Sequence, residues 1–200
     1  MASNLVHMTV HIAGVRPLLW HSFGPDAIPL EKQERTGVAG NDPEEWKKTV
    51  LATKDGQLYL EPSYVFGCVR DAARYTKKGK GSIQAAVSAT LQVLDERVLT
   101  DRYMPSAADG GTLTNDPDMP VYLDVRSVRN PSTKARNVRY RVAASTGWRC
   151  RFTLLFDKTI VSRAEMESVL RDAGQLVGLA DGRSIGFGRF TIEHVDTDAG

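Results

Sequence analysis

Two short segments alternate apolar and polar residues with a period of two, and this pattern restricts the possible folds more than any other feature of the chain. Residues 5–13 (LVHMTVHIA) place four apolar side chains on one face and two histidines with a threonine on the other. Residues 148–156 (WRCRFTLLF) repeat the alternation with larger apolar side chains. Because successive side chains of a strand point to opposite faces, both segments are predicted to be strands with one buried face.

Helical periodicity occurs between and after these strands. A helix is predicted over residues 62–75, since Pro62 suits the first helical position and apolar residues follow at helical spacing. A second helix is predicted over residues 82–95. A third is predicted over residues 162–177, because a serine and a glutamate three residues apart form a capping box at its start and a glycine follows its end.

The order of the elements indicates the fold class. Further strands are predicted over residues 57–60, 121–128, 137–143 and 189–195. With the loops removed, the order is β–α–β–β–α–β, that of the ferredoxin-like fold. We therefore expect one α+β domain over residues 1–200, with a ferredoxin-like (RRM-like) βαββαβ core, a long N-terminal loop insertion over residues 21–56 and a basic β-hairpin.

Composition excludes several classes of protein. The chain has 200 residues, 42% of them apolar, and its 26 basic residues nearly balance 24 acidic ones, so it is not a histone-like polybasic protein. Its two cysteines match no metal-ligand or redox spacing, which favours buried thiols in a reducing compartment. No apolar run approaches the roughly 18 residues of a membrane span. A cytoplasmic protein without membrane contact is expected.

Basic residues gather in two places. Residues 125–156 contain eight arginines and lysines and no acidic residue, and a second basic cluster follows the first predicted helix. Arginine suits phosphate recognition, so both clusters are predicted to bind RNA, against the alternative of a solvated surface. The residues predicted to contact RNA are Arg70, Arg74, Lys77, Lys78, Lys80, Arg126, Arg129, Lys134, Arg136, Arg139 and Arg141.

A glycine-rich loop, residues 178–190, precedes the last predicted strand. Its glycines allow positive φ and close approach of the backbone to a phosphate or sugar, although they also suit a plain helix-to-strand turn. It is neither a P-loop nor a dinucleotide-binding fingerprint, and the four histidines lack metal-ligand spacing, so no cofactor and no metal are expected. The loop residues predicted to contact RNA are Gly182, Arg183, Ser184, Gly186 and Gly188.

In combination, three segments resemble the RAMP superfamily of CRISPR-associated proteins. They are the glycine loop DGRSIGFGRFTIE, the helix opening LEPSYVFGCVRDAARY and the stretch from Arg126 through STGWRCRFTLLFD. In the helix opening the matching positions are Pro62, Ser63, Gly67 and Arg70. Within this superfamily the chain looks most similar to the backbone subunit. The resemblance implies an RNA-binding protein that assembles with copies of itself and other effector-complex subunits along a single-stranded guide RNA.

Two alternatives stay open. One is an endoribonuclease of the same fold, for which Asp26, Asp42 and Asp55 lie in comparable loop positions, although no catalytic residue is expected. The other is a stand-alone or phage-borne interaction module, whose basic hairpin would dock on acidic protein. Stacking of bases on the open sheet face is not expected, because the first and third core strands offer histidines and arginines there instead of aromatic residues.

Overall fold

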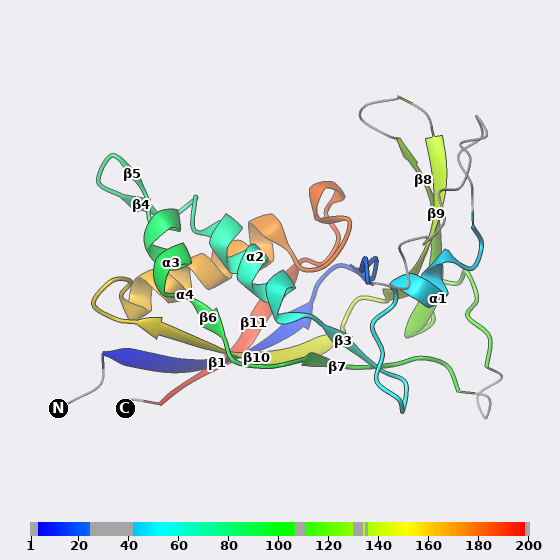
Figure 1. Ribbon diagram of the computed structural model, residues 1–200, viewed down its shortest axis with the longest axis horizontal. Coiled ribbons are helices and arrows are strands. Elements are labelled where there is room, and N and C mark those ends of the chain that lie inside the picture. Colours follow the sequence, from blue (N-terminus) through cyan, green and yellow to red (C-terminus); the bar gives the residue numbers. More distant parts are fainter. Residues whose placement is uncertain (1–3, 25–41, 107–110, 130–133, 135, 199–200) are drawn as a thin grey trace.

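The computed structural model of the chain describes residues 4–24, 42–106, 111–129, 134 and 136–198. These residues form a mixed α+β fold with four α-helices and antiparallel strand pairings (Figure 1). The strands are β1 (Leu5–Gly14), β2 (Leu18–Leu19), β3 (Gln57–Leu60), β4 (Lys77–Lys78), β5 (Gly81–Ser82), β6 (Gln92–Val93), β7 (Val98–Tyr103), β8 (Val121–Arg129), β9 (Arg136–Ala144), β10 (Arg149–Asp157) and β11 (Phe190–Asp198). The helices are α1 (Glu45–Thr49), α2 (Pro62–Ala72), α3 (Gln84–Thr90) and α4 (Arg163–Asp172).

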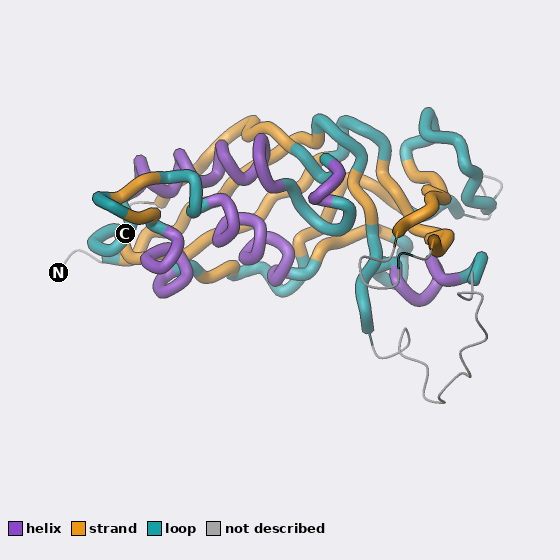
Figure 2. Tube along the Cα trace, turned by 90° about the horizontal axis from the view of Figure 1, so that it is seen from above, coloured by secondary structure: helices purple, strands orange, loops and turns teal. Residues whose placement is uncertain are grey.

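The main sheet has the strand order β11-β1-β10-β7-β3, and β6 also pairs with β10. The helices α2, α3 and α4 lie across one face of this sheet (Figures 1 and 2). The alternation predicted for β1 and β10 is confirmed, since Met8, Val10, Ile12, Phe152 and Leu154 are buried between the sheet and these helices. No described helix is long and apolar enough to cross a membrane.

A second, three-stranded sheet (β2-β9-β8) stands at one end of the molecule (Figure 1). The expected basic hairpin is therefore present as β8 and β9, paired from Val121–Ala144 to Arg129–Arg136. At its base, Tyr122 and Ala143 pack with Leu19 and Phe187 in a small separate core, whereas Val121, Val142 and Ala144 belong to the main core. The outer half of β8 is exposed, as is Arg136 at the start of β9, whereas residues 137–140 of β9 are half-buried.

The predicted helix is wrong for residues 91–95, and the strand over residues 98–103 is not predicted from the sequence. The helix predicted over residues 82–95 ends at Thr90, where Leu91 takes an extended conformation, and the chain then forms β6 and β7. Pairing of Gln92 and Val93 with β10 outweighs the local helical propensity of this segment. The two short strands occupy the position beside β10 in the main sheet.

Other sequence predictions about the helices are confirmed. Ser162 and Glu165 form the predicted capping box of α4. That helix continues into a π-helical turn (Ala173–Val177) and ends at Gly178, which has a φ of 83°. Helix α2 begins at Pro62 as predicted and ends three residues earlier than expected.

Both cysteines are free and buried, as predicted. Burial raises the pKa of Cys68 to about 12, and burial also raises the pKa of Cys150. Because the thiolate is the reactive form of cysteine, both side chains act as small apolar groups in the core.

The join between β1 and β10 is tightly packed. The ring of Trp148 is fully buried, and its Nε1 donates a hydrogen bond to the carbonyl of Arg16 at 2.8 Å. A Cβ atom on Gly14 would lie 2.0 Å from this Nε1. In contrast, a Cβ atom on Gly67 in α2 would meet no atom within 4 Å.

We expect the substitutions Gly14→Ala and Gly67→Ala to have opposite effects on stability. Gly14→Ala should lower the free energy of unfolding by roughly 3 kcal/mol, because the buried indole cannot move aside. Gly67→Ala should raise it by about 0.5–1 kcal/mol, because alanine favours the helix and the space is open. Urea unfolding of both variants measures this. Equal destabilisation by the two changes would contradict the packing.

Candidate nucleic-acid interface

The glycine loop (residues 178–190) folds back on itself before β11. A 3₁₀ turn (Arg183–Ile185) at its tip is flanked by Gly182 and Gly186, both in the left-handed conformation. A Cβ atom on Gly188 would lie 2.0 Å from the carbonyl oxygen of Leu179, so this glycine is needed for close approach within the loop itself. No atom lies within 4 Å of the corresponding position at Gly186. Of these two glycines, Gly186 is the one that leaves backbone open to a ligand.

A groove of about 620 Å³ lies between the glycine loop, the end of α2 and the hairpin. We call it the loop groove; its lining includes Arg74, Tyr75, Val128, Leu176, Arg183 and Ile185. The fold therefore brings together residues from all three groups predicted from the sequence. These are Arg74 from the second basic cluster, Arg141 from the hairpin, and Gly182, Arg183 and Ser184 from the loop.

The hairpin is fixed to the glycine loop by a buried ion-pair network. The Arg141 side chain is 5% exposed, and its Nη1 donates to Asp181 Oδ2 of the loop at 2.6 Å. Its Nη2 lies 3.7 Å from Oδ2 of Asp124, a buried residue on the paired strand. The register confirms that Arg139 and Arg141 share one face of β9, as predicted, but the guanidinium of Arg141 is enclosed within the protein.

Arg126 forms a second contact between the hairpin and the loop. Its Nε donates to Asp124 at 2.5 Å, and its guanidinium lies 4.6 Å above the ring of Phe187. A second depression, of about 430 Å³, is lined by Arg16, Arg126 and Gly186 among others. Ile185 borders both hollows, so the tip of the glycine loop separates two surfaces that each carry arginine.

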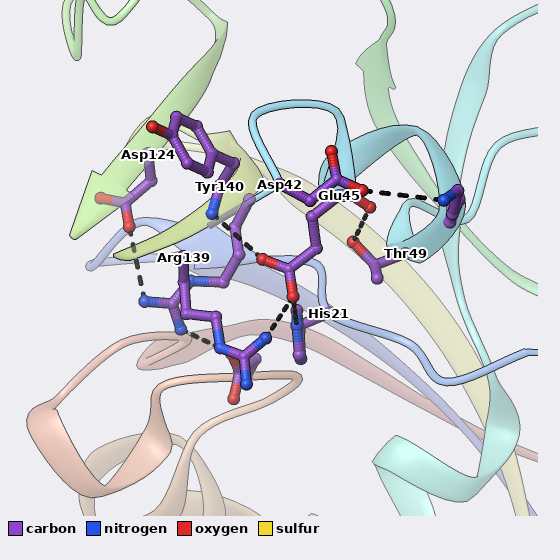
Figure 3. Close-up of polar contacts among 10 residues, drawn as sticks. His21, Asp42, Glu45, Thr49, Asp124, Arg139 and Tyr140 are labelled. Atoms are coloured by element: carbon purple, nitrogen blue, oxygen red, sulfur yellow. Dashed lines mark hydrogen bonds and ion pairs between the residues drawn. The ribbon is translucent and has the colours of Figure 1, made fainter. Parts of the chain in front are cut away.

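Glu45 of α1 makes a further contact with strand β9 of the hairpin. Its carboxylate contacts the guanidinium of Arg139 and accepts a hydrogen bond from the backbone N–H of Tyr140 at 3.4 Å (Figure 3). It also lies 3.1 Å from Nε2 of His21. The expectation of an unopposed basic hairpin is therefore incomplete, because carboxylates distant in sequence, Glu45 and Asp181, face two of its arginines.

The second basic cluster is divided between two locations. Asp71 lies within ion-pair distance of three guanidinium groups, those of Arg70 (2.9 Å), Arg74 (3.6 Å) and Arg183 (3.4 Å). Lys77, Lys78 and Lys80 belong to the small β4–β5 hairpin, at the end of the molecule away from β8 and β9 (Figure 1). Lys78 forms an ion pair with Glu165 at 3.3 Å. Of this cluster, Arg74 lines the loop groove and Arg70 pairs with its lining residue Asp71, whereas the lysines do not line it.

The exposed half of the hairpin pairs like charges. The register places Arg126 opposite Arg139 and Arg129 opposite Arg136. Directly opposed like charges on antiparallel strands lower stability. Arg129 and Arg136 are exposed, as is Lys134 near the hairpin tip.

Two of the three loop aspartates considered for RNA cleavage, Asp42 and Asp55, have structural contacts. Asp26 lies outside the described residues. The Asp42 carboxylate accepts a hydrogen bond from the backbone N–H of Glu44 and forms an ion pair with Lys48. Asp55 accepts the Thr53 hydroxyl at 2.6 Å, and this hydrogen bond lowers the pKa of its carboxyl. Among the described residues, no group of three or more histidine, cysteine or acidic side chains is arranged to hold a metal ion.

Sequence reasoning missed several residues that line these hollows. Tyr75 and Ile185 are exposed apolar side chains of the loop groove, and Arg16 lines the second depression. Tyr75 falls at the end of a predicted helix, and Arg16 belongs to no motif. Only the tertiary arrangement shows that these side chains lie beside the glycine loop.

Comparison with known proteins gives a likeness of fold. No protein-family model matches the sequence, and no curated protein matches it either. The structure is similar to a chain in the cryo-EM structure of the Type III-B Cmr-β bound to cognate target RNA, with a TM-score of 0.51 and 12% sequence identity. The similarity covers 98% of this chain and 61% of that chain, so this chain corresponds to part of a longer one.

We expect Arg141→Ala to destabilise the protein by roughly 3 kcal/mol, because it leaves the buried carboxylate of Asp124 without one of its cations. Arg149→Ala is the matched control, since that guanidinium pairs with Glu193 on an exposed surface and should contribute less than about 1 kcal/mol. Urea unfolding at pH 7 compares the two. Equal effects would contradict a structural role for the buried network.

Proposed function

We propose that the chain is an RNA-binding subunit of the RAMP type, which assembles with copies of itself along a single-stranded guide RNA in a CRISPR-type effector complex. It contacts the RNA backbone largely without regard to sequence, in the cytoplasm, and no catalytic residue is assigned to it. Similarity of fold to a chain of an RNA-bound Type III-B assembly supports this proposal.

The sheet order supports a ferredoxin-like core. We take four core strands in chain order: β1 is the first, β6 and β7 together are the second, β10 is the third and β11 is the fourth. In the sheet, β11 lies beside β1, β1 beside β10, and β10 beside β6 and β7, which is the order 4-1-3-2. Helices α2 and α4 follow the first and third core strands in the sequence and cover the same face (Figure 1). This is the βαββαβ arrangement, with the β8–β9 hairpin as an addition to it.

The register of the hairpin is the observation that carries the proposal. Arg129 and Arg136 are opposed on a projecting hairpin, an arrangement that lowers the stability of the free protein. A polyanion removes this repulsion, because phosphates can lie between or beside the two guanidinium groups. The adjoining Arg126 and Arg183 extend the positive surface to the glycine loop, and Ser184 adds a hydroxyl.

The proposed RNA path runs from the hairpin over the glycine loop. It includes the two hollows that flank Ile185 and excludes the lysines of β4 and β5, which lie at the other end of the molecule (Figure 1). Arg141 supports this path without touching RNA, because its side chain is buried. Assembly partners are further copies of the chain and other effector subunits.

We expect the double variant Arg129→Gln, Arg136→Gln to bind a single-stranded RNA 20-mer about tenfold more weakly than the parent, with unfolding free energy unchanged or slightly higher. The slope of log affinity against log salt should fall by about 0.7 for each RNA phosphate that the variant no longer neutralises. Fluorescence anisotropy at several salt concentrations measures both quantities.

The matched control is Arg149→Gln, Arg151→Gln, which removes the same charge from the open face of the main sheet. This control should keep the parental affinity. If the control weakens binding as much as the hairpin variant does, the RNA path is not along the hairpin and the proposal fails.

A further inference from the structure

Exposed apolar side chains concentrate around the loop groove. Tyr75 (47% exposed), Val128 (37%), Leu176 (46%) and Ile185 (64%) all line it, although they come from four separate segments. Gathered apolar surface of this kind marks a place where a ligand with apolar faces binds. A phosphate has no such face, so the backbone contacts proposed above leave these four side chains unexplained.

The floor of the groove offers both acceptors and donors. Asp181 uses Oδ2 for Arg141, and its side chain is 38% exposed. Donors come from Arg74 and Arg183, which line the groove with side chains that are 54% and 37% exposed. A guanidinium at the surface of a groove can donate hydrogen bonds to the edge of a bound base.

The charges that line the groove are paired with one another. Asp71 lies within ion-pair distance of Arg74 and Arg183, and Asp181 within ion-pair distance of Arg141. Because each lining guanidinium already faces a carboxylate, its attraction for an anion is reduced. These paired charges instead suit a planar heterocycle that carries hydrogen-bond donors and acceptors on its edge.

We propose that the loop groove binds one nucleobase of the RNA and prefers guanine; this inference rests on the proposed function. Tyr75 supplies an aromatic surface for stacking. The neighbouring N1–H and N2–H donors of guanine match the exposed carboxylate of Asp181, and its O6 accepts from a guanidinium. Adenine and cytosine present a ring acceptor where guanine presents N1–H, and uracil offers a single ring donor between two carbonyl oxygens, so each matches a carboxylate less well.

The test compares two single-stranded RNA octamers, one of eight uridines and one with a single central guanosine, by fluorescence anisotropy. The guanosine octamer should bind the parent protein about tenfold more tightly. Tyr75→Ala should remove most of this advantage, and Tyr75→Phe should keep it, because stacking needs the ring and not the hydroxyl. Asp181→Asn should also reduce it, and thermal unfolding shows whether that variant keeps its fold.

Tyr103→Ala is the matched control, since Tyr103 is 51% exposed and lies outside the groove. It should leave both affinities unchanged. Equal binding of the two octamers by the parent overturns the base site while leaving the proposed function intact. If the Tyr75→Ala variant still binds the guanosine octamer about tenfold more tightly than the uridine octamer, the base site is also overturned. The apolar side chains of the groove would then bind an apolar protein segment. Failure to bind either octamer overturns both proposals.

Discussion

The guanidinium of Arg141 lies buried between Asp124 on the neighbouring strand and Asp181 in the glycine loop. This contact joins the hairpin to the glycine loop, in addition to the apolar packing of Val121, Val142 and Ala144 in the main core. A buried charge that loses its partner is costly, so the three side chains hold the hairpin in one orientation. The loop groove exists because that orientation places Val128 of the hairpin opposite the glycine loop.

The rest of the candidate interface follows from this orientation. Arg126 is held over Phe187 beside the second depression, and Glu45 of α1 fixes Arg139. These arginines also serve internal contacts, so Arg129 and Arg136, the exposed outer pair, are the arginines of the paired strands most open to a polyanion. Some arginines of the hairpin therefore position it, and others are open to bind RNA. These two roles are consistent with the gathering of eight basic residues in residues 125–156 of a chain whose total charge is nearly balanced.

The sequence predicts the features that depend on local pattern. Alternation gives β1 and β10, the Ser162–Glu165 pair gives the start of α4, and the basic hairpin is found where expected. Strands β6 and β7 are missed because they are short and form by pairing with distant segments. The candidate site is predicted in part for the same reason. Alternation places Arg139 and Arg141 on one face, but it cannot show which carboxylates from distant segments meet them.

The central claim is that single-stranded RNA lies across the hairpin and the glycine loop, and not on the open face of the main sheet. Photocrosslinking of RNA that contains 4-thiouridine, followed by mass spectrometry of the crosslinked peptides, tests this most directly. The account predicts crosslinks within residues 70–76, 121–129 and 182–189, which border the two hollows. Crosslinks confined to residues 97–103 and 149–155, on β7 and β10, would contradict it.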